Sequence, residues 1–403
     1  MPTLLEINIT SNHGSTGKIA EAVGLLMRQR GWDVYLAHGA RYVNPSSLQS
    51  YQIQNKCGEY LHAMKSFLLD ADGLGSKGAT KKLVEFIRHI KPDIIHIHNL
   101  HGYYLNYEVL FGYLNTTDIQ IVMTLHDCWT FTGHCTHFVT AGCNKWKTMC
   151  HDCPLTRSVP RSLFLDMSRR NFLKKISTIA ANKNLHLVGV SRWICGLIGE
   201  SMYKGFSLSY IANGIDTTIF TPSSRYRHED GRVRVLSVAN VWNRDKGLYD
   251  IYRLRSLLPA DRYDILLVGL DKRQIRNLPH GISGIGRTAN QEELARIYAS
   301  CDVFINPTYA DTFPTTNLEA LASGLPVITY DTGGSPEAVD MSTGIVVPQG
   351  DIQAMAEAIL SLPTDNSITR QACRERAVTR YDRDKRFMDY ADLFESLLSK
   401  PPK

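Results

Sequence analysis

The order of secondary structure along the chain is the feature that most constrains its fold. Short runs rich in Val, Ile and Leu recur in two series, separated by longer segments with helical periodicity. The first series is LLEINIT, DVYLAHG, DIIHIHN, IQIVMTLHD and LHLVGVS, and the second is RVLSVAN, YDILLVG, DVFINP, PVITYD and GIVVP. Such alternation is typical of parallel sheets covered by helices on both faces. The sequence therefore predicts an α/β protein with two doubly wound, Rossmann-like domains.

The two predicted domains meet near SLSYIANGID, where we expect a strand followed by a turn at Asn213-Gly214. We place the N-terminal domain at residues 1–205, with a cysteine-rich insertion at 128–154, and the C-terminal domain at 206–385. Residues 386–403 are expected to form a terminal helix that packs back toward the N-terminal domain. A chain of 403 residues exceeds what one hydrophobic core usually organises, which also favours two domains.

Composition predicts a cytoplasmic protein, with one basic segment that suggests the inner face of the membrane. The start of the chain does not resemble a signal peptide, and no stretch approaches the roughly 18 apolar residues of a membrane span. The net charge of +6 is carried by the first half. A basic cluster at Arg169, Arg170, Lys174 and Lys175 is either a solvated helix face or a surface for anionic lipid headgroups or an acidic substrate.

The first predicted strand is followed by the glycine-rich segment SNHGSTGK, residues 11–18. A phosphate-binding loop of an ATPase needs G-x-x-x-x-G-K-[ST], whereas this segment has Asn12 at the first glycine position and Ile19 after the lysine. The ATPase interpretation is therefore not favoured. Gly14 and Gly17 instead predict a turn that lets a ligand approach the first strand closely.

The stretch that carries most chemical information is DTFPTTNLEALASGLPVITYDTGGSPEAV, residues 311–339. Thr315 and Thr316 are good cap residues for a helix that starts just after a strand ends. The N-terminus of such a helix presents unpaired amides, which suit a diphosphate, and the Glu319 carboxylate can accept hydrogen bonds from a vicinal diol. The alternative is that Asp311 and Glu319 only favour the helix dipole.

These residues resemble a known family. Asp311 and Glu319, followed by A-x-A-x-G-x-P-V-I and G-G-x-x-E, are similar to the donor-site signature of retaining glycosyltransferases of family 4. The resemblance extends to Asn213-Gly214-Ile215-Asp216 and to ELARIYASCDVFINPT, and it is greatest to bacterial capsule and exopolysaccharide transferases. It implies the GT-B fold, in which two Rossmann-like domains face each other across a cleft and the second binds most of the sugar nucleotide.

The resemblance implies roles for individual residues around the donor. Glu319 would bind the ribose hydroxyls, and Asp311 stands where the family usually has a glutamate that touches the donor sugar. The shorter aspartate leaves the identity of the sugar open. The remaining donor-binding residues implied are Gly14, Gly17, Phe313, Pro314 and Thr315, whose backbone would lie near the sugar and phosphates.

The segment VANVWNRDKG resembles the phosphate-binding loop of the same family. Lys246 matches the usual lysine, whereas Asn240 stands where an arginine is common, so Arg244 is expected to replace that arginine. Two cations beside a glycine at a strand end also suggest anion binding without any family, the alternative being a solvated loop. Both cations would stabilise the charge that develops on the leaving phosphate.

The first domain offers histidines at the ends of predicted strands. By resemblance, His126 would touch the transferred sugar, although a lone histidine is more often a structural group. The acceptor candidates are His98, Asn99 and His101, at the end of another strand. We therefore assign His126, Asp311, Arg244 and Lys246 to catalysis, which the resemblance implies to proceed with retention and without a cofactor.

The segment HDCWTFTGHCTHFVTAGCNKWKTMCHDCP, residues 126–154, holds five of the nine cysteines of the chain. Cys135, Cys143, Cys150 and Cys153 follow the pattern C-x7-C-x6-C-x2-C, whose last pair has the spacing of a zinc knuckle. A structural zinc ion would fold a loop that is too short to form its own core. An apolar cluster of free thiols is the competing interpretation.

The sequence thus predicts a retaining glycosyltransferase of surface polysaccharide biosynthesis. It would transfer a hexose from a UDP- or GDP-linked donor to a saccharide or lipid-linked acceptor, with peripheral membrane association and no nucleic-acid partner. One alternative is a sugar-nucleotide epimerase or phosphorylase on the same fold. Another is a zinc-containing nucleic-acid-binding protein, which the basic first half suggests and the lack of repeated aromatic and basic residues opposes.

Overall fold

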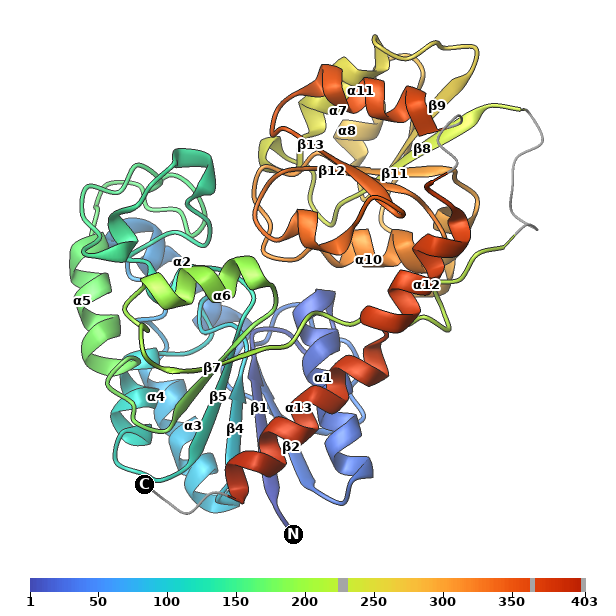
Figure 1. The fold of residues 1–403 in the computed structure, drawn as a ribbon. Helices are drawn as coiled ribbons and strands as arrows, with labels where there is room; N and C mark the ends of the chain where they lie inside the picture. Colours follow the sequence, from blue (N-terminus) through green and yellow to red (C-terminus); the bar gives the residue numbers. More distant parts are fainter. Residues whose placement is uncertain (224–230, 363–366, 400–403) are drawn as a thin grey trace. The chain divides into compact units, whose positions relative to one another are not determined.

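The computed structural model describes residues 1–223, 231–362 and 367–399. The chain forms two compact units, and each contains one parallel sheet (Figure 1). The first unit comprises Met1–Ala212 and Phe387–Lys403, and the second comprises Asn213–Arg386. No helix of the described residues has the length and apolar character needed to cross a bilayer.

The first unit is built on a seven-stranded sheet of order β3-β2-β1-β4-β5-β6-β7 in which all neighbours are parallel. The strands are β1 Thr3–Asn8, β2 Asp33–His38, β3 Gln49–Gln52, β4 Ile94–Ile97, β5 Gln120–Leu125, β6 Leu185–Gly189 and β7 Ser207–Tyr210. Strand order reverses between β1 and β4. In open parallel sheets, ligands bind beyond the carboxyl ends of the strands at such a reversal.

Helices cover both faces of this sheet (Figure 1). They are α1 Gly14–Gln29, α2 Lys56–Leu69, α3 Lys77–Ile90, α4 Tyr107–Leu114, α5 Ser168–Thr178, α6 Arg192–Glu200 and the later part of α13 Arg383–Leu398. Because side chains alternate along a strand, each buried strand supplies two hydrophobic cores. One core packs on α3, α4, α5 and α6, and the other packs on α1 and α13.

The second unit has a six-stranded parallel sheet of order β10-β9-β8-β11-β12-β13. Its strands are β8 Val233–Val238, β9 Tyr263–Val268, β10 Ile282–Ile285, β11 Val303–Asn306, β12 Val327–Tyr330 and β13 Gly344–Val347. Its helices are α7 Leu248–Arg255, α8 Lys272–Arg276, α9 Gln291–Ala299, α10 Thr315–Ala322, α11 Ile352–Ser361 and α12 Arg370–Arg380. Here strand order reverses between β8 and β11, so this unit also has one expected ligand-binding edge.

The boundary between the units differs from the one placed at 205 and 206. The structure ends the first sheet later, because β7 pairs in parallel with β6 and thereby belongs to the first unit. At the other end, Phe387, Tyr390 and Phe394 of α13 are buried in the same core as α1. The terminal helix therefore completes the first unit and covers one face of its sheet.

Candidate functional site

In the second unit, the predicted donor-site residues lie on loops at the carboxyl ends of neighbouring strands. The loop after β8 leads into a short 3-10 helix, Arg244–Lys246, and the loop after β11 carries Asp311 and leads into α10. The loop after β12 carries Gly333. Because β8 and β11 flank the point where strand order reverses, these loops surround the expected ligand-binding edge.

Lys246 and Asp311 form an ion pair that joins two of these loops. The Lys246 Nζ atom lies 2.6 Å from Asp311 Oδ2, and both side chains remain partly exposed. The side chain of Asn243 accepts a hydrogen bond from the Lys246 amide at 3.0 Å, and the Tyr309 amide donates to the Asp245 carbonyl at 2.7 Å. The predicted lysine and aspartate are therefore held together, with the ammonium available to a ligand.

Two glycines let these loops pack backbone against backbone. A β-carbon at Gly247, where φ is 71°, would lie 2.2 Å from the Pro307 carbonyl oxygen. A β-carbon at Gly333, where φ is 56°, would lie 2.0 Å from the Asp311 carbonyl oxygen. Any other residue at either position would push the loops apart. Gly247 therefore fixes the distance between the loop of Lys246 and the loop of Asp311, and Gly333 fixes the distance between the loop of Asp311 and the loop after β12.

The N-terminus of α10 differs from its prediction. Pro314 is the N-cap residue, Thr315 is the first helical residue, and no side chain caps the helix, so neither threonine takes the predicted capping role. Proline at the cap leaves the amides of the first turn to other partners. The preceding carbonyl, that of Phe313, accepts a hydrogen bond from Asn213 Nδ2 at 3.0 Å, which connects this turn to the predicted Asn213-Gly214 segment.

Glu319 lies one turn into α10 and is half-buried. Its Oε2 atom accepts a hydrogen bond of 2.9 Å from the hydroxyl of Tyr298, a fully buried residue of α9 that the sequence did not single out. Burial, followed by the charge of Glu319, raises the pKa of Tyr298 well above its ordinary value, so the phenol stays a donor. Tyr298 thus orients one oxygen of the carboxylate.

Arg244 and Asn240 are both exposed at the end of β8. Burial and the Asp250 carboxylate raise the pKa of Tyr309 to about 12, and the positive charge of Arg244 opposes that rise. Arg244 therefore lies close enough to Tyr309, on the loop after β11, for their charges to interact. This is the neighbourhood in which the sequence predicts a second phosphate-binding cation.

In the first unit, the turn after β1 has the predicted strand, turn and helix arrangement. Gly14 is exposed with φ of 66° and begins α1. Gly17 is buried, and a β-carbon there would lie 2.5 Å from Thr10 Oγ1. Gly17 therefore allows the helix to pack on the turn, and of the two predicted glycines it is Gly14 that a ligand can reach.

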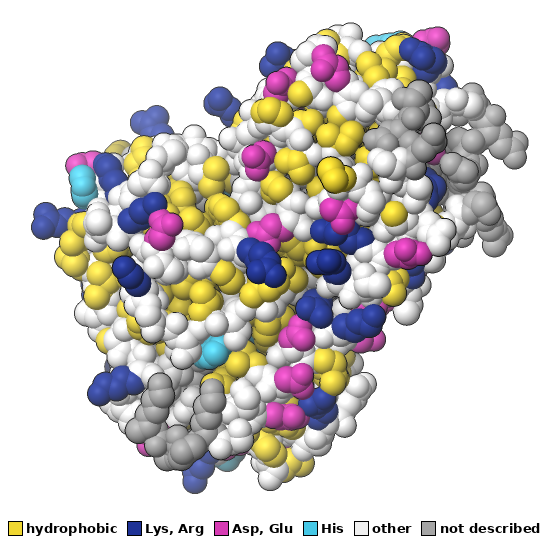
Figure 2. All heavy atoms as spheres, in the orientation of Figure 1, with side chains coloured by type: hydrophobic (Ala, Val, Ile, Leu, Met, Phe, Trp, Pro, Cys, Tyr) yellow, Lys and Arg dark blue, Asp and Glu magenta, His cyan; other side chains and the backbone are white. Residues whose placement is uncertain are grey.

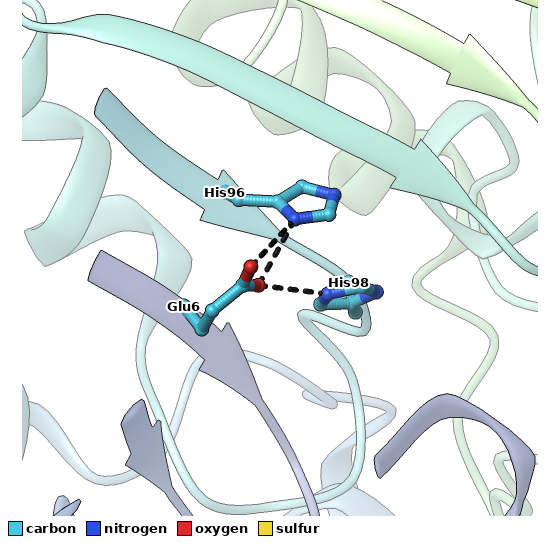
Figure 3. Close-up of side chains that lie close together, drawn as sticks. All are labelled: Glu6, His96 and His98. Atoms are coloured by element: carbon cyan, nitrogen blue, oxygen red, sulfur yellow. Dashed lines mark hydrogen bonds and ion pairs between the residues drawn. The ribbon is translucent and has the colours of Figure 1, made fainter. Parts of the chain in front are cut away.

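Three buried side chains meet at the centre of the first sheet (Figure 3). Glu6 of β1 lies between His96 of β4 and His98, which follows that strand. Glu6 Oε2 is 2.9 Å from His96 Nδ1 and 3.0 Å from His98 Nε2. The sequence predicted His98 but not Glu6 or His96, although charged and histidine residues inside runs of Ile and Leu were the signal that could have revealed them.

This cluster continues to His126. His98 Nδ1 is 3.0 Å from His126 Nε2, and on the opposite side His96 Nε2 is 2.8 Å from Thr124 Oγ1, which is 3.2 Å from the Tyr390 hydroxyl. A neutral imidazole has one donor and one acceptor nitrogen. When Glu6 is ionised, both neighbouring histidines donate to it, so His126 Nε2 must donate to His98. His126 then presents Nδ1 as an acceptor.

The pKa values of this chain of groups follow from burial. Loss of water lowers the pKa of His96 and His98 to about 3 and that of His126 to about 4, and raises the pKa of Glu6. Glu6, His96 and His98 place three metal-ligating atoms within 4.8 Å of one another, the closest such group of the described residues. Their mutual hydrogen bonds, however, already satisfy the carboxylate and both imidazoles, which favours a relay over a metal site.

The other predicted acceptor residues gather around an aspartate that the sequence did not predict. Asp127 Oδ2 lies 2.6 Å from His101 Nε2 and accepts a hydrogen bond of 3.2 Å from Asn99. Although burial alone would raise it, the pKa of Asp127 is lowered to about 2 by His101 and by further hydrogen bonds. Its partner His101 has a raised pKa, since Asp127 outweighs the effect of burial. The arrangement favours a charged pair beside His126.

The cysteine-rich segment folds with three short 3-10 helices, Trp129–Phe131, Val139–Ala141 and Lys145–Lys147. Cys135, Cys143, Cys150 and Cys153 line one cavity together with His134. Cys135 and Cys150 are also part of the hydrophobic core with Phe138 and Trp146. The structure therefore brings the four predicted thiols around one space, which both interpretations of the segment accommodate.

The predicted basic cluster on α5 does not form one solvated face. Lys175 is 1% exposed and donates to the carbonyl oxygens of Trp129 and Thr132, because it points into the core. Lys174 is paired with Glu108 at 2.5 Å, and only Arg169 and Arg170 are exposed. On the face drawn in Figure 2, Lys and Arg side chains are interspersed with Asp and Glu.

Comparison with known proteins identifies the second unit. Residues 232–365 match the protein family described as "Glycosyl transferases group 1". The second unit is a group 1 glycosyltransferase domain. The chain is also similar to a protein of Escherichia coli K12 named as a colanic acid biosynthesis glycosyl transferase, WcaC, with 23% identity over 329 residues, 76% of this chain and 77% of that protein.

Solved structures extend the similarity to the whole chain. Sucrose-phosphate synthase from Thermosynechococcus elongatus has a TM-score of 0.75 at 18% identity and covers 99% of this chain and 100% of its own. The Anabaena protein Alr3699/HepE, determined in complex with UDP, has a TM-score of 0.66 at 15% identity, covering 98% and 100%. With its two parallel-sheet α/β units, the chain that carries this glycosyltransferase domain thus has the GT-B fold.

Proposed function

We propose that the protein is a retaining hexosyltransferase of surface polysaccharide biosynthesis, with a nucleoside diphosphate sugar as donor. The observation that carries the proposal is the ion pair between Lys246 and Asp311 beside the uncapped N-terminus of α10, at the ligand-binding edge of the glycosyltransferase domain. A cation and free amides at one strand end suit a diphosphate. The UDP complex of Alr3699/HepE supports a nucleotide donor, and UDP and GDP both remain candidates.

The chemistry proposed for this edge is stabilisation of the leaving diphosphate. As the bond to the sugar breaks, negative charge grows on the phosphate, and Lys246, Arg244 and the amides of α10 interact with it more strongly than in the ground state. Glu319, oriented by Tyr298, binds the ribose diol. Asp311 holds the lysine and contacts the donor sugar. The leaving phosphate accepts the proton of the acceptor hydroxyl, so retention needs no carboxylate nucleophile and no cofactor.

We assign contacts with the acceptor and with the transferred sugar to the first unit. His126 accepts a hydrogen bond from a sugar hydroxyl through Nδ1, in the tautomer that ionised Glu6 imposes through His98. Asn99 and His101, held by Asp127, bind acceptor hydroxyls, and Gly14 lets the donor phosphates approach β1. The acceptor is a saccharide or a lipid-linked saccharide, as the role in the name of WcaC suggests.

We also propose peripheral association with the inner face of the membrane, through a surface other than α5. Tyr60, Leu61 and Met64 of α2 are 54–63% exposed, and Phe164 is 76% exposed. The two segments are adjacent, because the Leu163 amide donates to the Phe67 carbonyl at 2.8 Å. Exposed Lys65, Arg157 and Arg161 lie on these same segments, and such a mixture of apolar and basic side chains suits anionic lipid.

Sedimentation with vesicles tests that surface. The wild-type protein should sediment with vesicles of phosphatidylglycerol and less with vesicles of phosphatidylcholine. The double variant Met64→Ser, Phe164→Ser should lose this binding while keeping its melting temperature. A control variant, Met341→Ser, alters a methionine of the second unit that is even more exposed, and it should bind as the wild type does. Binding that is unchanged in the double variant would contradict the assignment.

Nucleotide binding and turnover test the main proposal. A panel of UDP- and GDP-linked hexoses should reveal one donor that is hydrolysed slowly without acceptor and transferred when an acceptor is added. Lys246→Ala should weaken binding of the matching nucleoside diphosphate by about 10- to 100-fold, the value of a hydrogen bond between charged groups. The control variant Lys272→Ala, which removes an exposed cation of α8, should bind this nucleoside diphosphate as the wild type does. Equal affinity in the wild type and Lys246→Ala would disprove the donor site.

The alternatives are not favoured. The matched family and the relative from Escherichia coli are both named as transferases, which does not support an epimerase or phosphorylase. The mixed charges of the surface in Figure 2 do not favour a nucleic-acid-binding protein. Salt-sensitive binding of arbitrary DNA or RNA would be evidence for a nucleic-acid-binding protein.

A further inference from the structure

The cavity of the cysteine-rich segment contains more metal-ligating groups than an apolar cluster requires. It is lined by all four cysteines of the C-x7-C-x6-C-x2-C pattern and by His134. The described cysteines are all free, and the Cys135 and Cys153 thiols are close enough to interact with each other. The Gly133 amide donates to Cys150 Sγ at 3.2 Å. Amide donors of this kind stabilise a thiolate, which is the form that binds a metal.

The turn between the last two cysteines has the geometry of a metal-binding knuckle. Asp152 has φ of 42°, an uncommon conformation for a residue other than glycine, which turns the chain sharply between Cys150 and Cys153. As a result both thiols face the same cavity. Lys145 Nζ closes the turn from outside by donating to the carbonyls of His151 and Asp152 at 3.0 Å each.

A second observation is an unpaired nitrogen on His134, a residue that lines this cavity. His134 is 2% exposed, and its Nδ1 atom lies 2.6 Å from Asp70 Oδ1. Its Nε2 atom is buried and has no hydrogen-bond partner. An unsatisfied buried nitrogen is costly, so it indicates a group in the cavity to which it donates or binds.

A third observation is the buried ammonium of Lys175. It donates to the carbonyls of Trp129 and Thr132 at 2.5 and 2.9 Å and lies 3.3 Å from the centre of the Trp129 ring. Among its interactions with the described residues there is no ion pair with a carboxylate. The charges that act on it are first that of the Asp72 carboxylate, then those of Cys150 and Cys135, and then that of Asp127. A buried cation of this kind is stabilised by a nearby anion.

We propose that Cys135, Cys143, Cys150 and Cys153 bind one structural Zn²⁺ ion as a tetrathiolate, with His134 Nε2 and Lys175 compensating its charge. On binding, four thiols lose their protons to solvent and four zinc–sulfur bonds form, giving a site of net charge −2. In the structure, no three of these sulfur atoms lie within 4.8 Å of one another. Among the described residues, the group of metal-ligating atoms that lies within this distance is formed by Glu6, His96 and His98. Metal binding therefore draws the four sulfurs inward and crosslinks the segment.

Metal analysis tests the proposal on the full chain, purified with a tag that does not bind metal and without added zinc. Mass spectrometry should find about one zinc ion per chain, and X-ray absorption should give four zinc–sulfur distances of about 2.3 Å. Addition of a thiol-reactive mercurial should release the zinc. A metal-free, fully folded preparation overturns the proposal, as does a site with zinc–nitrogen bonds.

Variants locate the ion. Cys153→Ser and Cys143→Ser should lower bound zinc at least tenfold, whereas Cys57→Ser, which alters an exposed cysteine of α2, should retain it. His98→Gln and His134→Gln should retain zinc as well. Loss of zinc in His98→Gln but not in Cys153→Ser would assign the metal to the group at Glu6 and overturn the tetrathiolate. If the serine variants do not fold, cobalt substitution of the wild type decides, because tetrahedral thiolate ligation gives strong visible absorption.

Discussion

His98 is hydrogen-bonded to His126 through one ring nitrogen and to Glu6 through the other, at 3.0 Å in each case. Because neutral imidazole donates from one nitrogen and accepts at the other, the protonation of Glu6 sets the tautomer of His126. Ionised Glu6 leaves His126 Nδ1 as an acceptor. Protonated Glu6 can donate to His98, which then donates to His126 and converts Nδ1 into a donor. A fully buried acid thus determines which hydrogen bond the partly buried His126 can offer to a ligand.

The first prediction concerns this relay. Glu6→Gln adds a permanent N–H donor and should convert a fraction of His126 to the other tautomer, lowering the transfer rate by about 10- to 100-fold while leaving nucleotide affinity unchanged. Nitrogen-15 NMR of labelled histidine measures the tautomer directly. His186→Gln is the matched control, since His186 contacts Ser209 at 2.9 Å outside the relay. An unaltered tautomer together with an unaltered rate in Glu6→Gln would exclude the positioning role.

The second prediction concerns Glu319. If its carboxylate binds the ribose diol, the wild type should bind the preferred nucleoside diphosphate about 10- to 100-fold more tightly than its 2′,3′-dideoxy analogue. Glu319→Ala should bind the two alike. Tyr298→Phe removes the 2.9 Å hydrogen bond but keeps the carboxylate, so it should retain most of the discrimination. Calorimetric titration measures all six affinities. Discrimination that persists in Glu319→Ala would place the ribose elsewhere.

The third prediction concerns the contact between the loops of Lys246 and Asp311. Gly247 and Gly231 both have φ of 71°, but a β-carbon would lie 2.2 Å from the Pro307 carbonyl at Gly247 and contact nothing within 4 Å at Gly231. Alanine should cost about 1–2 kcal/mol of folding free energy at either position, through backbone strain alone. Only Gly247→Ala should also separate the loops and weaken nucleotide binding. Thermal unfolding and titration of both variants measure the two effects, and equal nucleotide affinities would show that the contact does not shape the site.

The fold could be predicted from sequence because most of its strands are buried on both faces. Such strands are runs of Ile, Val and Leu, which a periodic pattern reveals, as for Ile94–Ile97 and Val327–Tyr330. Two strands gave no such signal. β3, Gln49–Gln52, is a largely exposed edge strand, and β10, Ile282–Ile285, contains Gly284. Edge strands need less apolar surface, so pairing with the neighbouring strand decides their structure.

The residues that we propose for the donor site follow strands in a recognisable order, which is why the sequence singles them out, and the structure brings two of them, Lys246 and Asp311, into contact. The supporting residues could not be predicted. In the sequence, Tyr298 looks like an ordinary core residue of a helix, and Glu6 looks like a solvated residue of a strand. Only the fold shows that Tyr298 contacts Glu319 and that Glu6 contacts His98. Lys175 shows the converse, because a lysine among basic residues is expected in solvent, whereas its side chain is buried.

The last prediction is that the first unit loses stability as the pH falls, because its relay histidines are buried in neutral form. Their pKa values of about 3, 3 and 4 lie below the value of 6.5 that each has when unfolded. Between about pH 4 and 6.5 the unfolded chain therefore binds protons that the folded unit does not, and the free energy of unfolding falls as the pH falls. Each histidine contributes up to about 1.4 kcal/mol per pH unit. Glu6, His101 and His134 have the opposite sign, since their raised pKa values let the folded unit bind a proton first. They are three groups against five, because burial also lowers the pKa of His38 and His62.

Hydrogen exchange of the β4 and β5 amides at pH 5 and pH 7 measures this dependence for the first unit alone. His126→Gln removes one of the three groups and should make the pH dependence less steep, whereas His280→Gln, which alters an exposed histidine of the second unit, should not. The direction in which protection of the β4 and β5 amides changes with pH decides the question. Protection of β4 and β5 that increases on acidification would mean that the relay holds its protons in the folded state, and the tautomer assigned to His126 would then be wrong.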